Sequence, residues 1–153
     1  MAAQLFESVY DVTGRDFTNA GRASTAIKDT LKRLGVPPAV VRRVAIASYE
    51  AEMNVVIYAP SGSVSVSVTP TEIQVCVADN GPGIADLDQA MRPGFSTAPA
   101  KARAMGFGAG MGLPNIARCC DELSIETDPA AGGSRVVMRF RRGEAQTREG
   151  VTS

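Results

Sequence analysis

Two polar residues whose side chains could act together lie four positions apart in an apolar segment. They are Glu50 and Asn54, within residues 38–58, which we predict to be a buried helix. Residues four apart on a helix project from the same face. A carboxamide oxygen suits Mg²⁺, and a carboxylate beside it can orient or deprotonate a nucleophile. The same spacing also occurs on an ordinary polar surface strip. Glu52, a further acid on this helix, is expected either to face solvent or to support Glu50.

A second candidate is Asp79, at the end of a predicted strand. Residues 73–77 alternate between apolar and small or polar, and Asp79 continues the inward phase of that alternation. A buried carboxylate needs a hydrogen-bond donor, and an adenine amino group is one suitable donor. Residues 80–84 read Asn-Gly-Pro-Gly-Ile, where the glycines allow close approach to the backbone. The alternative is a turn that simply ends the strand.

A third candidate is the glycine-rich stretch that precedes a predicted helix. Glycines occupy positions 106, 108, 110 and 112. Backbone N–H groups at such a helix start can bind phosphate. The stretch is not a dinucleotide-binding fingerprint, because the required third glycine and preceding strand are missing, and the chain has no P-loop sequence. The alternative is a flexible linker.

Composition excludes several classes of function. The 153 residues include no histidine, which rules out serine–histidine or cysteine–histidine nucleophile systems, a phosphorylated histidine within this chain, and histidine-ligated metals. Lys+Arg and Asp+Glu are both 16, so no net field favours nucleic acid or a membrane surface. Three cysteines without a CxxC pair indicate neither a disulfide framework nor a zinc site. No membrane span or signal peptide is recognisable, so we expect a soluble, cytoplasmic protein.

Hydrophobic periodicity predicts the elements that must position these residues. We expect strands at 5–12, 64–68, 73–78, 123–127 and 135–141, and helices at 20–34, 38–58 and 112–122. Two consecutive helices and paired strands are too few βα alternations for a doubly wound sheet. The predicted fold class is therefore α+β: a two-layer sandwich with a mostly antiparallel, mixed sheet and helices on one face.

The three candidate motifs, in this order, resemble the N, G1 and G2 boxes of the GHKL ATP-binding fold, also called the Bergerat fold. The boxes are Glu50 with Asn54, residues 79–84, and residues 108–113. The resemblance covers about residues 5–141. It implies one ATP-binding kinase domain over residues 1–142, with a lid at about 91–112 and a polar tail over 143–153.

The resemblance also implies roles for individual residues. Asn54 would ligate Mg²⁺, Glu50 would be the general base, and Asp79 would accept a hydrogen bond from adenine. Gly81 and Gly83 would keep the base pocket open, and Ile84 would line it. The segment that wraps the phosphates would contain Gly108, Gly110, Met111, Gly112 and Leu113. Ser134 would lie near adenine.

Within that fold, the lack of histidine and of room for further domains points to the serine kinases that act as anti-sigma factors or switch proteins. Residues 54–59 and 93–97 look most like the stressosome switch kinase, which phosphorylates a STAS-domain partner. The alternative is a nucleotide-gated protein that holds a sigma factor or other partner without significant kinase activity. A domain that only scaffolds is a third reading. The resemblance leaves open whether the chain forms a homodimer.

Overall fold

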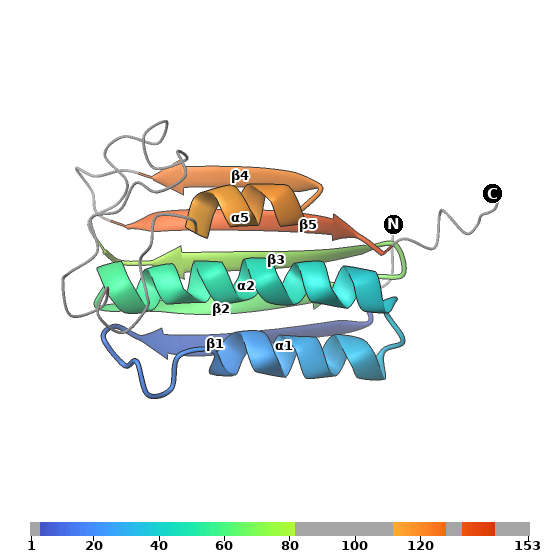
Figure 1. Ribbon diagram of the computed structural model, residues 1–153, viewed down its shortest axis with the longest axis horizontal. Helices are drawn as coiled ribbons and strands as arrows, with labels where there is room; N and C mark the ends of the chain where they lie inside the picture. The colour runs from blue at the N-terminus through green and yellow to red at the C-terminus, as the bar shows by residue number, and fades with distance from the viewer. Residues whose placement is uncertain (1–3, 82–111, 128–132, 143–153) are drawn as a thin grey trace.

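Five strands form one sheet in the computed structural model, which describes residues 4–81, 112–127 and 133–142. The strands run from one edge to the other in the order β1-β2-β3-β5-β4, and all four pairings are antiparallel (Figure 1). Their bounds are Phe6–Thr13 (β1), Ser61–Val68 (β2), Glu72–Asp79 (β3), Glu122–Thr127 (β4) and Ser134–Arg141 (β5).

Strict alternation gives this sheet one apolar face. In β2, valines at every second position are buried, whereas the intervening serines are not. The register places apolar residues opposite one another in rows across the sheet, and such cross-strand contacts stabilise it. One row contains Val64, Val77, Val136 and Ile125, and the next contains Val66, Val75, Met138 and Leu123.

In the part of the chain that the structure describes, three helices cover that apolar face (Figure 1). α1 spans Arg22–Arg33, α2 spans Pro38–Tyr58 and α5 spans Gly112–Cys119. Pro38 suits the first turn of α2 because that turn needs no backbone donor there. α2 is about 30 Å long at the usual rise per residue. It buries 11 of its 21 residues, because it lies between α1 and α5 in the helical layer and also packs against the sheet.

The predicted fold class is confirmed, with no parallel pairing among the strands that the structure describes. The predicted helix at 112–122 is shorter and ends at Cys119, whose carbonyl oxygen accepts a hydrogen bond from Arg43 Nη1 at 3.2 Å. A cation at a helix C-terminus is favourable, because the last carbonyls carry partial negative charge. None of the described helices is long and apolar enough to cross a bilayer. The predicted tail over 143–153 and nearly all of the predicted lid lie outside the described residues.

Candidate functional site

The motif residues that the structure describes come from elements that meet at one end of the sheet. The C-terminal end of α2, the end of β3, the start of β5 and the start of α5 all lie there (Figure 1). Gly81 shows how tightly these elements approach. A Cβ atom added at Gly81 would lie 3.0 Å from both Tyr58 O and Ala59 Cβ, at the end of α2. Glycine is needed at 81 because the chain packs closely against α2.

Asp79 and Ser134 form a hydrogen-bonded pair at this end. They lie opposite each other in the register between β3 and β5, and Ser134 Oγ donates to Asp79 Oδ2 at 2.8 Å. The backbone N–H of Gly81 donates to Asp79 Oδ1 at 2.9 Å. Each carboxylate oxygen can accept two hydrogen bonds, so the half-buried Asp79 keeps acceptor capacity after these contacts.

Gly133 brings the start of β5 against the end of β3. Its φ is +93°, and a Cβ atom there would lie 2.6 Å from Asp79 O. Its backbone N–H also donates to Gly81 O. Only glycine combines a left-handed backbone with such a close approach. The Gly-Gly pair at 132–133 indicates a turn before the last strand in the sequence, but Gly133 was not among the predicted site residues.

Glu50 and Asn54 are both half-buried on α2, one helical turn apart. Glu50 Oε2 accepts a hydrogen bond from Asn115 Nδ2 on α5 at 3.3 Å. The Asn54 carboxamide makes no hydrogen bond to any residue within the described ranges. Asn115 was not among the predicted site residues, because no local pattern links a residue on α5 with one 65 positions earlier in the chain.

The predicted glycine-rich segment is described only at its end. Gly112 begins α5, and Leu113 is 7% exposed and belongs to the hydrophobic core. The Leu113 side chain therefore anchors α5 in the hydrophobic core, which leaves the Leu113 backbone as the part that could face a phosphate. Five predicted site residues lie outside the described residues: Gly83, Ile84, Gly108, Gly110 and Met111.

Both readings of Glu52 were wrong. Its side chain is neither on the surface nor beside Glu50 as a support, because it is 2% exposed and caps α1. Glu52 Oε2 accepts from the backbone N–H groups of Gly21 at 3.0 Å and Ala23 at 3.3 Å, and Oε1 accepts from Ser24 at 3.0 Å. The first N–H groups of a helix lack partners within it and carry partial positive charge, so a carboxylate there is favourable.

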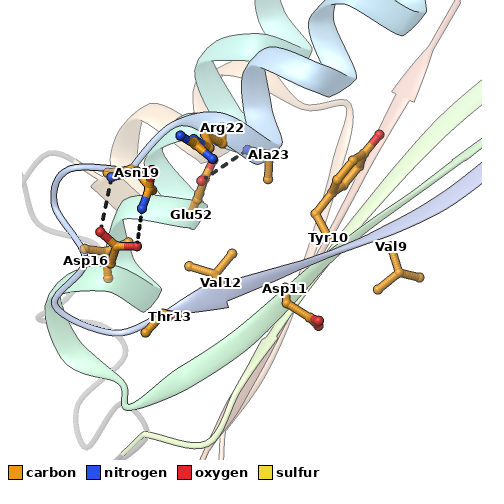
Figure 2. A pocket seen from close by; sticks show the side chains of 12 residues that line it. Val9, Tyr10, Asp11, Val12, Thr13, Asp16, Asn19, Arg22, Ala23 and Glu52 are labelled. Atoms are coloured by element: carbon orange, nitrogen blue, oxygen red, sulfur yellow. Dashed lines mark hydrogen bonds between the residues drawn. The ribbon is translucent and has the colours of Figure 1, made fainter.

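Glu52 also lines a cavity of about 430 Å³ between β1 and the start of α1 (Figure 2). Beside it, Asn19 Nδ2 donates to Asp16 Oδ2 at 2.7 Å, and Asn19 N donates to Asp16 Oδ1 at 3.3 Å. None of the predicted site residues within the described ranges lines this cavity. The carboxylate of Glu52 is directed to α1 rather than to a ligand, so we assign the cavity no part in the site.

Charges gather where α2 and α5 meet. Burial raises the pKa of the Cys119 thiol, while the nearby Arg118 and Arg43 lower it and Glu50 raises it. Burial also raises the pKa of the Tyr49 phenol, and the carboxylates of Glu50 and then Glu52 raise it further. At the next residue, just after α5 ends, burial is the main cause that raises the pKa of the Cys120 thiol. The Cys119 thiol therefore lies within electrostatic reach of Glu50 and of the two arginines, Arg43 on α2 and Arg118 on α5.

The profile of the histidine kinase-like ATPase domain matches residues 15–140. The chain belongs to this family. Its predicted membership of the GHKL fold is thereby confirmed, and the match spans the three helices within the described residues and most of the sheet.

Two curated relatives and one solved structure illustrate the likeness. The chain is 28% identical over 119 residues to the serine/threonine-protein kinase RsbT of Bacillus subtilis, covering 75% of this chain and 84% of that protein. It is 30% identical over 96 residues to an anti-sigma F factor of Shouchella clausii, covering 59% of this chain and 62% of that protein. The fold is similar, with a TM-score of 0.57 and 15% identity, to the RsbU and RsbW domains of a Mycobacterium tuberculosis protein, covering 88% of this chain and 32% of that one.

The described residues suit the ATP and Mg²⁺ that the family implies. Asn54 offers a carboxamide oxygen with no protein partner among the described residues, and Mg²⁺ prefers oxygen ligands. Asp79 offers spare acceptor capacity at the point where Gly81 and Gly133 bring the backbone close. The chain is an ATP-binding domain by family, and its relatives are kinases and anti-sigma factors.

Proposed function

We propose that this protein is a regulatory serine/threonine kinase that transfers phosphate from ATP to a STAS-domain antagonist in a partner-switching pathway. The observation that carries the proposal is the Asp79–Ser134 hydrogen bond, at the same end of the sheet as the C-terminal half of α2. This bond holds the Asp79 carboxylate, which is an acceptor for a nucleotide base, at the end of the molecule where α2 carries Glu50 and Asn54.

Each residue then has a separate task. Asp79 accepts a hydrogen bond from the adenine amino group, with Ser134 and Gly81 holding its carboxylate in place. Asn54 would hold Mg²⁺, which neutralises charge on the phosphates. Glu50 accepts the proton of the protein hydroxyl that is phosphorylated. With so few catalytic side chains, rate acceleration comes chiefly from positioning and electrostatics.

Isothermal titration calorimetry with ATP, with and without Mg²⁺, tests the nucleotide site. We expect magnesium-dependent binding that Asn54→Ala weakens at least about tenfold, because the variant removes a ligand oxygen. No binding to the unaltered protein would contradict the proposal.

Phosphate transfer to purified STAS-domain proteins from the same genome tests the kinase step. Glu50→Gln keeps the shape of the side chain but removes its basicity, so we expect transfer to fall about a hundredfold with ATP affinity retained. Glu7→Gln on the exposed side of β1 is the matched control and should transfer like the unaltered protein. Equal transfer by Glu50→Gln would exclude Glu50 as the base.

A second candidate function is a nucleotide-gated anti-sigma factor with no significant kinase activity. The observation in its favour is the similarity to proteins named anti-sigma F factors, of which the chain spans 62% in Shouchella clausii and 67% in Geobacillus stearothermophilus. This candidate predicts ATP-dependent capture of a purified sigma factor by both the unaltered protein and Glu50→Gln. The kinase proposal instead predicts that the unaltered protein transfers phosphate and that Glu50→Gln does not.

A further inference from the structure

A chain of two hydrogen bonds connects α5 with the proposed base on α2. Arg118 Nη2 donates to Asn115 Oδ1, and Asn115 Nδ2 donates to Glu50 Oε2 at 3.3 Å. Asn115 and Arg118 are three positions apart on α5, so their side chains share one face of that helix. Asn115 is half-buried between the exposed Arg118 and the half-buried Glu50.

The charge of Arg118 determines which way the Asn115 amide points. A guanidinium group can only donate hydrogen bonds, so it must meet the carbonyl oxygen of the amide. The NH₂ group of Asn115 is then directed at Glu50, whose carboxylate can only accept when ionised. A flipped amide would oppose donor to donor at Arg118 and acceptor to acceptor at Glu50.

This contact makes the two carboxylate oxygens of Glu50 unequal. Oε2 is occupied by Asn115, while Oε1 has no partner among residues 4–81, 112–127 and 133–142. The contact also restricts rotation of a flexible side chain, which is what a base within hydrogen-bond reach of its proton requires. α5 itself is fastened to α2, since Arg43 donates to the carbonyl oxygen of Cys119 at 3.2 Å and lies 3.7 Å from Asp121 Oδ2.

We propose that Asn115 is a positioning residue that holds Glu50 through its amide, and that Arg118 sets the orientation of that amide. The inference rests on the proposed kinase function. In the step concerned, Glu50 Oε1 takes the proton of the acceptor hydroxyl while the hydroxyl oxygen bonds to the γ-phosphorus. The bond from that phosphorus to the bridging oxygen breaks, and ADP leaves with its electron pair. Asn115 touches neither reactant.

The decisive variant is Asn115→Asp, which has almost the same shape but replaces the donor facing Glu50 by an acceptor. We expect single-turnover phosphate transfer from Mg·ATP to the STAS-domain protein to fall at least about tenfold, and the Kd for Mg·ATP to change less than about threefold. Ala117→Asp is the matched control, because Ala117 is exposed on the same turn of α5 and this substitution adds the same negative charge as Asn115→Asp. It should transfer at the rate of the unaltered protein.

A double-mutant cycle separates positioning from general support of the fold. If Asn115 acts through Glu50, then Asn115→Asp should reduce transfer in the unaltered background and cause no further loss in the Glu50→Gln background. Asn115→Ala provides a second variant, with an expected loss of about fivefold because the donor is removed but no repulsion is added. Arg118→Ala should lower transfer, and Arg118→Lys should restore it, since lysine also only donates.

Two results would overturn the inference while leaving the kinase function intact. One is normal transfer by Asn115→Asp in a protein that Glu50→Gln inactivates. The other is an equal loss in both backgrounds, accompanied by a lower melting temperature, which would make Asn115 a structural residue only. Failure of the proposed function itself is distinct: the unaltered protein would not transfer phosphate, or Glu50→Gln would transfer normally.

Discussion

Ser134 lies directly opposite Asp79 across the β3–β5 pairing, and its hydroxyl donates to the Asp79 carboxylate at 2.8 Å. The two residues are 55 positions apart in the chain, yet each stands in phase with the buried residues of its own strand. The sheet register therefore assembles a carboxylate and a hydroxyl from two separate motifs.

The first prediction concerns this pair. Asp79→Asn should weaken ATP binding at least about tenfold, because the amide places a donor where the Gly81 N–H, the Ser134 hydroxyl or adenine must donate. Ser134→Ala should have a smaller effect, about fivefold, because one neutral hydrogen bond is lost. Calorimetric titration with ATP measures both. Asp11→Asn, on the exposed side of β1, is the control, and an equal loss there would contradict the assignment.

A second prediction follows from the cap that Glu52 provides for α1. Glu52→Ala should lower the free energy of unfolding by about 2–3 kcal/mol, because three backbone N–H groups lose their common acceptor. Glu52→Gln keeps one acceptor oxygen and should cost less. Urea unfolding followed by circular dichroism measures the difference. Glu7→Ala, at an exposed position, should unfold like the unaltered protein, and a similar value for Glu52→Ala would refute the capping role.

The third prediction separates backbone strain from steric clash at two glycines with positive φ. Gly133→Ala and Gly35→Ala both force alanine into a left-handed conformation, which costs about 1–2 kcal/mol. Only Gly133 has a backbone oxygen 2.6 Å from the new Cβ atom, whereas nothing lies within 4 Å at Gly35. Gly133→Ala should therefore be the more destabilising in urea and should also weaken ATP binding, because the clash displaces Asp79. Equal effects of the two variants on stability and on ATP binding would argue against a role of Gly133 in holding Asp79 in the nucleotide site.

The fourth prediction compares two buried serines. Ser48 is 0% exposed, and its hydroxyl has no hydrogen-bond partner among the described residues, whereas Ser24 is 5% exposed and donates to Gly21 O at 3.0 Å. Removing an unsatisfied hydroxyl relieves a desolvation penalty, so Ser48→Ala should be neutral or stabilise by up to about 1 kcal/mol. Ser24→Ala should destabilise by about 1 kcal/mol. Thermal unfolding of both variants checks the order, and a large loss for Ser48→Ala would be inconsistent with it.

Local patterns in the sequence were enough to predict every helix and strand that the structure describes. The alternation of serine with valine in β2 and the apolar residues of α2 are properties of short segments, so they can be recognised without any knowledge of distant contacts. The spacing of Glu50 and Asn54 is local in the same sense. Element ends were less certain: the last helix ends at Cys119, where Arg43 from another helix donates to its carbonyl oxygen, and no local pattern predicts that contact.

Tertiary structure alone decided which polar residues meet. By sequence, Glu50 and Glu52 are two acids on one helix, but two positions along a helix rotate a side chain by about 200° and so direct it to another neighbour: Glu50 contacts Asn115 on α5, and Glu52 caps α1. Likewise, Ser134 reaches Asp79 only because β5 inserts between β3 and β4. Residue types and local periodicity determine elements and candidate chemistry, whereas partners far apart in the chain depend on sheet order and helix packing, which no local pattern encodes.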